Sequence, residues 1–329
     1  MFNFEYQQAR SQLYKAIRNF FDKKGYLEVF TPSLSASLIP EPTIQNFESK
    51  FENEFIGGKD MYLIPSPEIF MKELLANGSG SIYQLSTCFR NSEQLGSIHN
   101  PEFTMLEYYT IDFDEKDSIA LTEEFIKAVA FKTTASSALP PFEKMSVNEA
   151  MIKYAQTDLE QLQDAQKLRA KAKKLGLCVD EKESWDDTFN RIFIQFVEPN
   201  LPTDKPVLLY DYPKQIDCLA ELKPNSNYRR RWEAYINGIE VANCYSEETD
   251  EAITKQYYEK EFSRLKEERN NTKLPIPQVS LSFPKLQIPK SSGVAIGVDR
   301  LLAALLNLKT IEPLLLFPFT SLLAQKTQK

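Results

Sequence analysis

The sequence predicts an α+β fold in which a mixed, mainly antiparallel sheet is flanked by helices. Two apolar segments, 81–90 and 103–111, are joined by a polar loop, as in a hairpin with a long, exposed connection. Further strand-like segments follow one another closely at 207–212, 232–236 and 239–245. Strands linked this tightly pair antiparallel, because a parallel pair needs a crossover of a dozen or more residues.

Helical periodicity and turn residues place the remaining elements. Apolar side chains recur at helical spacing over 5–24, and Gly25 offers the positive φ that commonly ends a helix. Ser66 as a cap, with proline after it, predicts another helix through Leu75. The other expected elements are strands at 26–30 and 61–64, a mainly helical insertion over about 116–200, a charged helix over 249–270, and a strand with a leucine-rich helix over 293–308.

Composition excludes several classes of protein. The chain has 329 residues, and 39 Lys and Arg against 46 Asp and Glu give a net charge of −7, which disfavours a protein that binds long nucleic acids. The hydrophobic content of 42% supports a packed core. One histidine and four scattered cysteines leave no zinc motif and no evident Ser-His-Asp triad. With no apolar run of about 20 residues, we expect no membrane span and a cytoplasmic location with reduced cysteines.

One face of the predicted strand 103–111 carries unusual side chains. Strand alternation puts Phe103, Met105, Glu107 and Tyr109 on this face. A carboxylate and a phenol beside an aromatic ring are unexpected in a plain core, so the face is a candidate binding surface. The alternative is a half-buried strand whose polar face meets solvent, and this strand alone does not decide between them.

A second group of polar side chains belongs to the later strands. Asn243, Tyr245 and Glu247 alternate on one face, and Glu233 precedes Glu240 by seven residues on the preceding strand. Two carboxylates on neighbouring strands can hold Mg²⁺, which prefers a few carboxylate oxygens together with phosphate and water. Two ordinary surface glutamates are the alternative.

Two arginines stand at strand ends, where they are candidates for phosphate binding. Arg90 ends one strand, and Arg300 follows the last strand, where the final helix begins. The planar guanidinium suits phosphate, although a surface or ion-paired arginine is the alternative for each. Gly293, Ala295 and Gly297 alternate along that last strand and leave one face almost without side chains, against which a flat group can lie.

These segments resemble the three signature motifs of class II aminoacyl-tRNA synthetases. Residues 25–32 (GYLEVFTP) are similar to motif 1, 89–107 to motif 2, and 293–300 (GVAIGVDR) to motif 3. The strings HNPEFTMLE at 99–107 and EVANCYSE at 240–247 resemble the lysyl branch. The resemblance covers nearly the whole chain, and three motifs in the right order are far more specific than one.

The resemblance implies a single class II catalytic domain over 1–329, without the anticodon-binding OB domain of lysyl-tRNA synthetases. It is nearest to the truncated lysyl-synthetase paralogues that ligate (R)-β-lysine to elongation factor P. It therefore implies ATP-dependent activation of (R)-β-lysine or lysine with Mg²⁺, elongation factor P as the partner, a homodimer, and no use of tRNA. The alternatives are a minimal lysyl-tRNA ligase and a catalytically inactive regulatory paralogue.

The resemblance also implies roles for individual residues. Arg90 and Arg300 are the expected catalytic residues, with Arg90 on the α-phosphate and Arg300 against the adenine opposite Phe103. The implied ATP-binding residues are Arg90, Asn91, Glu93, His99, Phe103, Glu240 and Arg300, and the implied magnesium ligands are Glu233 and Glu240. The implied residues for the diamino acid are Glu68, Glu107, Tyr109, Asn243, Tyr245, Glu247 and Ala295.

The sequence departs from the family pattern at a few positions. Ser92 stands where the family has glutamate, and Glu93 is a possible replacement in a loop that is one residue longer. Ala295 stands where lysyl-tRNA synthetases usually have glycine, and alanine is typical of the β-lysine ligases. In the implied arrangement Glu247 pairs with the distal ammonium of the substrate, while Glu68 and Glu107 lie near the other amino group.

Overall fold

The structure is a computed structural model that describes residues 4–39, 44–92, 96–134, 139–268, 277 and 282–324. Its larger sheet consists of β1 (Leu27–Glu28), β5 (Ile82–Phe89), β6 (Glu102–Ile111), β7 (Glu143–Ser146), β8 (Val207–Pro213), β9 (Tyr228–Ile236), β10 (Ile239–Ser246) and β11 (Ser291–Gly297). The smaller sheet consists of β2 (Leu34–Ser35), β3 (Glu48–Asn53) and β4 (Gly57–Leu63). The longer helices are α1 (Phe4–Lys23), α2 (Glu68–Ala76), α3 (Glu115–Thr134), α4 (Val147–Ala155), α5 (Ala165–Lys174), α6 (Trp185–Ile192), α7 (Glu251–Glu268), α9 (Val298–Leu305) and α10 (Phe319–Ala324).

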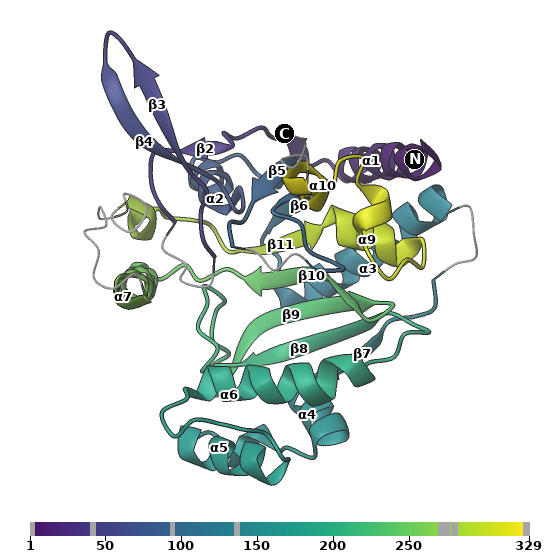
Figure 1. The fold of residues 1–329 in the computed structure, drawn as a ribbon, viewed down its shortest axis with the longest axis vertical. Helices are drawn as coiled ribbons and strands as arrows, with labels where there is room; N and C mark the ends of the chain where they lie inside the picture. The colour runs from purple at the N-terminus through teal and green to yellow at the C-terminus, as the bar shows by residue number, and fades with distance from the viewer. Residues whose placement is uncertain are drawn as a thin grey trace.

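The eight-stranded sheet has the order β1-β5-β6-β11-β10-β9-β8-β7 and runs through the middle of the molecule (Figure 1). The β1–β5 and β7–β8 pairs are parallel, and the other neighbours are antiparallel. The expected α+β class with a mixed, mainly antiparallel sheet is therefore confirmed. The predicted hairpin of 81–90 with 103–111 is β5 with β6, and Leu85 faces Leu106 in its register.

Helices α1, α3 and α9 cover one face of the large sheet, on the right in Figure 1. The residues that point to these helices from β6, β11, β10 and β9 are Leu106, Tyr108, Ile296, Val294, Ala242, Cys244, Trp232 and Ala234, and all are buried. Aromatic packing is dense here, since the Phe21 ring of α1 lies 4.8 Å from both the Tyr83 and Tyr108 rings. Because strand side chains alternate, the opposite face of the same strands remains available for a site.

The segment expected as one helical insertion over about 116–200 divides into two parts. Helix α3 belongs to the core described above, where Phe125 and Val129 are fully buried. Helices α4, α5 and α6 surround a second core with β7 and β8, in the lower part of Figure 1. The periodicity of α3 shows that the helix is amphipathic, but not which partner its apolar face meets.

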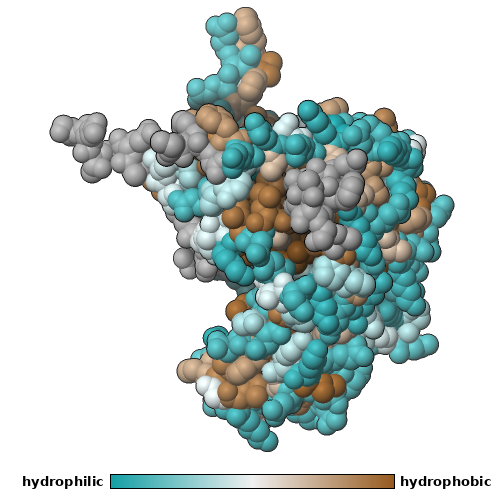
Figure 2. Space-filling view, turned by 90° about the vertical axis from the view of Figure 1, so that its right-hand side faces the viewer, coloured by the Kyte–Doolittle hydropathy of each residue, from teal (hydrophilic) through white to brown (hydrophobic). Residues whose placement is uncertain are grey.

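A β3–β4 hairpin projects from the molecule, and its tip carries exposed apolar residues. Phe55 is 85% and Ile56 is 78% exposed. Figure 2 shows the hairpin rising clear of the remaining surface, with brown and teal residues side by side. None of the described helices combines the length and the apolar character that a membrane crossing requires.

Candidate active site

Two adjoining cavities lie along the sheet face opposite α1, α3 and α9. The larger has a volume of about 370 Å³ and the smaller of about 200 Å³. Their common wall consists of four residues that line both cavities, namely Arg90, Met105, Asn243 and Ala295. The larger cavity is bordered by residues of α2, α6 and α7 as well as by the sheet.

Strand alternation explains why these side chains meet. On β6, Glu107 and Tyr109 point away from the helices that cover Leu106 and Tyr108, and they are 3% and 2% exposed. The solvent-facing alternative for this strand is therefore wrong. Ala295 of β11 lies between Glu107 and Asn243 in the register of the sheet, so its small side chain forms part of the floor.

The inner end of the larger cavity holds Glu247, which is buried against a lysine. The Lys72 Nζ atom lies 2.6 Å from Glu247 Oε2 and 2.6 Å from Glu68 Oε1, and the side chains of Lys72 and Glu247 are 1% and 2% exposed. Burial raises the pKa of Glu247 to about 7, although Lys72 opposes the shift.

Gly293 of β11 makes room for Glu247. A Cβ atom at this position would lie 2.4 Å from Glu247 Oε1 and 2.5 Å from Tyr109 Cε1. Both distances are far shorter than ordinary contacts, so only glycine allows these two side chains to cross the strand here. We expected the face of the strand over 293–297 to be almost without side chains. At Gly293 the side chains of Glu247 and Tyr109 fill this space.

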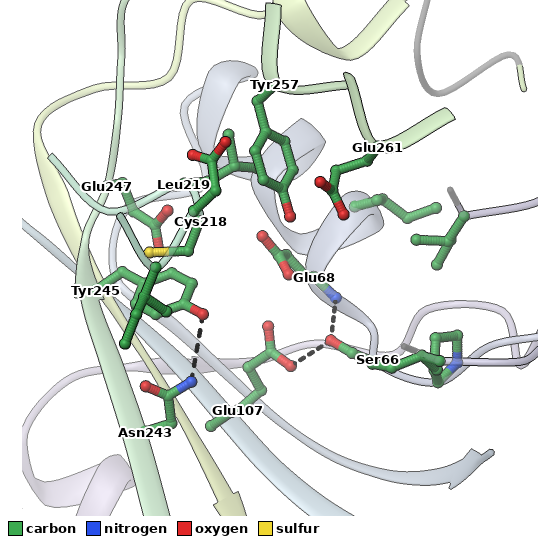
Figure 3. A pocket seen from close by; sticks show the side chains of 18 of the residues that line it. Ser66, Glu68, Glu107, Cys218, Leu219, Asn243, Tyr245, Glu247, Tyr257 and Glu261 are labelled. Carbon is green, nitrogen blue, oxygen red and sulfur yellow. Dashed lines mark hydrogen bonds between the residues drawn. The ribbon is translucent and has the colours of Figure 1, made fainter. Parts of the chain in front are cut away.

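A second buried carboxylate, Glu107, is held by two hydroxyl groups. Ser66 Oγ donates to Glu107 Oε2 over 2.8 Å, and Tyr109 OH donates to Glu107 Oε1 over 2.7 Å. Burial, with the nearby charge of Glu68, raises the pKa of Glu107 to about 7. In Figure 3 the carboxylates of Glu68, Glu107 and Glu261 point toward a common space, with the Tyr245 and Tyr257 rings at its border.

The smaller cavity combines an aromatic ring with cationic side chains. It is lined by Phe103, His99, Glu240 and Arg300 in addition to the shared wall. The Arg90 guanidinium lies 5.2 Å from the centre of the Phe103 ring, and the buried Arg90 Nε has no hydrogen-bond partner among the described groups. An unpaired buried donor of this kind is open to an anion.

Arg300 is fixed at the start of α9. Its Nε donates to the carbonyl oxygen of Ile98 over 3.2 Å, and its Nη1 lies 3.6 Å from Glu240 Oε2. The preceding residue, Asp299, accepts the backbone N–H of Thr104 over 2.8 Å and pairs with Arg10 of α1 at 2.6 Å. These contacts anchor the helix start beneath the cavity.

Three predicted residues lie outside both cavities or outside the described chain. The two carboxylate oxygens of Glu233 accept from Arg231 Nη2 over 2.6 Å and from Tyr235 OH over 2.7 Å, and Glu233 is not among the residues that line the smaller cavity. Asn91 is exposed and forms a backbone bridge with Gln45 instead of facing a cavity. Glu93 lies outside the described residues.

Glu240 is half-exposed at the edge of the smaller cavity. Partial burial and the neighbouring Glu233 raise the pKa of Glu240, and Arg300 opposes this shift. Glu198, from the helical part of the chain, adds a further negative charge near Glu233 and Arg300. A concentration of negative charge of this kind favours a bound cation.

Sequence reasoning missed several residues of the site. Ser66 was expected only as a helix cap, yet it also donates to Glu107. Arg231 is buried between the Tyr212 and Tyr245 rings, at 4.4 and 5.5 Å, and donates to Asn243 Oδ1 over 3.2 Å. Tyr257 and Glu261 reach the larger cavity from α7, whose sequence shows only a charged helix. Helical periodicity carries no signal for such contacts.

The fold and the two cavities define a catalytic domain of the class II tRNA synthetase type. The sequence profile of the family described as "tRNA synthetases class II (D, K and N)" matches residues 4–321. The chain belongs to this family, as its three motifs predicted.

Individual members of the family are similar to this chain over nearly their whole length. The chain is 35% identical over 312 residues to a protein of Erwinia tasmaniensis named elongation factor P--(R)-beta-lysine ligase, with 94% of this chain and 93% of the relative covered. Proteins with the same name from Proteus mirabilis and Photorhabdus laumondii are 34% and 35% identical, over 314 and 320 residues. These matches cover 94% of this chain and 93% and 94% of the two relatives.

Proposed function

We propose that this chain is an ATP-dependent ligase that activates (R)-β-lysine or lysine as an aminoacyl-adenylate and transfers it to a lysine side chain of elongation factor P. The pair of adjoining cavities carries the proposal, because one is lined by carboxylates and the other by an aromatic ring and arginine. An adenylate joins a carboxyl group to a nucleotide phosphate and therefore spans two such cavities. The names of the relatives support elongation factor P as the acceptor.

In the first step, a carboxylate oxygen of the diamino acid attacks the α-phosphorus of ATP, and the bond to pyrophosphate breaks. Arg90 stands in the wall between the cavities, where the several N–H donors of its guanidinium can hold both the carboxylate and the α-phosphate. Phe103 and Arg300 provide the surfaces for the adenine, and Arg300 stabilises the phosphate charge. Such chemistry depends on positioning and charge stabilisation, so it needs no histidine base.

Magnesium fits this site through Glu240. Its carboxylate lines the smaller cavity, and Mg²⁺ commonly takes one or two carboxylates while phosphates and water supply the other oxygens. The described residues contain no cluster of three or more potential metal ligands. When bound, the ion would neutralise phosphate charge, and the charge of Glu233, which acts on Glu240, would add to the attraction for the cation.

The diamino acid lies in the larger cavity with its carboxylate toward Arg90. Glu247 receives the distal ammonium, because it is a buried carboxylate that lines this cavity. Glu68 and Glu107 receive the other ammonium, with Tyr109, Asn243 and Tyr245 around the chain of the substrate. The Ala295 methyl group, at the shared wall, is placed to separate (R)-β-lysine from lysine by the position of the amino group.

In the second step, the acceptor amine attacks the carbonyl carbon of the mixed anhydride, so that an amide forms and AMP leaves. We also infer a homodimer through the first motif, since Leu27 and Phe30 are 55% and 81% exposed near Pro32. A cytoplasmic location accords with the four cysteines, all of which are free.

Two assays test the proposal. ATP–pyrophosphate exchange is measured with (R)-β-lysine, with lysine and with ornithine as a shorter control. The intact mass of elongation factor P is then measured after incubation with ATP and each amino acid, beside a tRNA acylation assay. We expect exchange with at least one of the two longer amino acids and a mass increase of elongation factor P. Acylation of tRNA without modification of elongation factor P would instead establish the minimal lysyl-tRNA ligase.

A further inference from the structure

A buried lysine that touches neither cavity lies directly behind the amino acid site. Lys72 belongs to α2, is 1% exposed, and does not line the larger cavity, whereas both of its partners, Glu68 and Glu247, do. Its Nζ atom lies 2.6 Å from an oxygen of each carboxylate. One ammonium group therefore links two side chains that come from α2 and from the end of β10.

The surroundings of Lys72 keep it positively charged. Burial alone would favour the neutral amine, but the two carboxylates outweigh it, and the pKa of Lys72 lies well above its ordinary value. The Phe283 ring, whose centre lies 5.7 Å from Nζ, adds a weak attraction for a cation. The lysine is thus a fixed positive charge within the protein, out of reach of the substrate.

The charges that face the larger cavity then favour one class of substrate. Glu68, Glu107, Glu247 and Glu261 line it with carboxylates, and Lys72 cancels part of the negative charge of its two partners. The negative charge that remains suits a substrate with two ammonium groups. A buried charge without a partner is costly, so a pocket with this balance disfavours an amino acid that brings only one ammonium.

We propose that Lys72 is a positioning residue that sets the substrate specificity of the pocket; this inference rests on the proposed function. It holds the Glu68 and Glu247 carboxylates in place and cancels the surplus negative charge, so that Glu247 remains ionised to receive a distal ammonium. Lys72 does this without contacting the substrate.

The charged and titratable groups around Glu247 define what the loss of Lys72 would change. Lys72 and Glu68 face it from α2 and Tyr109 from β6. Cys244 of β10 interacts with it electrostatically, and Tyr258 of α7 interacts with Lys72. Lys72 is the single cation in this group. Without it, burial and Glu68 raise the pKa of Glu247 further, and a protonated Glu247 no longer distinguishes an ammonium from a methyl group.

The test compares Lys72→Met with the compensated double variant Lys72→Met/Glu68→Gln. The Lys144→Met variant is the control, because Lys144 is an exposed lysine paired with Glu123 at 2.6 Å. Pyrophosphate exchange is measured with the better diamino acid and with its analogue that lacks only the distal ammonium. The first readout is the ratio of kcat/KM for the diamino acid to kcat/KM for the analogue. The second is the midpoint pH, at which the KM for the diamino acid lies halfway between its low-pH and high-pH values.

We expect Lys72→Met to lower the ratio by about 10-fold or more and to raise the midpoint pH by about one unit or more. The double variant, in which no surplus charge is buried, should recover the ratio and the midpoint at least in part even if its KM remains high. Lys144→Met should match the wild type in both readouts.

An equal loss for both amino acids with an unchanged midpoint pH would show a purely structural role and overturn the inference. If Lys72→Met does not fold, the inference is judged on the double variant. A double variant that shows no preference for the diamino acid over the analogue overturns the inference. Wild-type enzyme that exchanges with no diamino acid refutes the proposed function itself, which separates the two failures.

Discussion

Replacement of Gly293 by alanine tests the geometry of the amino acid site most directly. The new Cβ would lie 2.4 Å from Glu247 Oε1, and ordinary contact begins at 3.4 Å, so the carboxylate must move by 1.0 Å. It has little space to do so, because Lys72 is paired with it and Tyr109 blocks the other side. A displacement of about 1 Å at a reacting or binding group costs about 10²-fold in rate, or about 2.8 kcal/mol.

We therefore expect Gly293→Ala to lower kcat/KM for the diamino acid in pyrophosphate exchange by about 10²-fold and to destabilise the fold by about 1–3 kcal/mol. The matched control is Gly58→Ala on the β3–β4 hairpin, where the nearest atom is the flexible end of Lys50 at 3.3 Å. Thermal melting monitors folding in both variants. A folded Gly293→Ala enzyme with the kcat/KM of the wild type would refute the role assigned to the glycine.

Three further predictions concern the site. Glu247→Gln should lower kcat/KM for the diamino acid by at least about 10²-fold while the KM for ATP changes less than about threefold, in pyrophosphate exchange; an unchanged amino acid KM would remove Glu247 from the pocket. Arg300→Ala should slow adenylate formation about 10²- to 10³-fold, measured as AMP release in single turnover, and normal turnover would contradict its phosphate role. Because the pKa values of Glu107 and Glu247 are raised to about 7, the KM for the diamino acid should fall as pH rises from about 6 to about 8, and a flat profile would contradict this.

Ionisation of Glu107 and Glu247 favours substrate binding but lowers the stability of the fold. Since their pKa values in the folded chain exceed the ordinary 4.5, the folded state binds more protons than the unfolded state between about pH 4.5 and about pH 7. Their contribution to the free energy of unfolding is therefore greatest at low pH and is lost as pH rises through 7. Binding of a diamino acid should offset this loss, since its ammonium groups favour the ionised carboxylates.

Much of the site could be predicted because strand alternation and motif spacing are local properties. The period of two separated Glu107 and Tyr109 from the core residues Leu106 and Tyr108, and the structure keeps that separation. The partners of Asn91 and Glu233 could not be predicted from the motifs, because the direction of a side chain depends on its contacts in the folded chain. For Glu233 those partners are Arg231 and Tyr235.

The sequence by itself determined most of the strands and helices, although not β2, β3 and β7, and it determined the alternation along β6 and the family. Only the tertiary structure decided that Lys72 lies behind Glu68 and Glu247, and that Gly293 makes room for Glu247. In the sequence, Lys72 is one more lysine on a short helix. Its role arises because α2 and the end of β10 meet in the buried interior, where unpaired charges are costly.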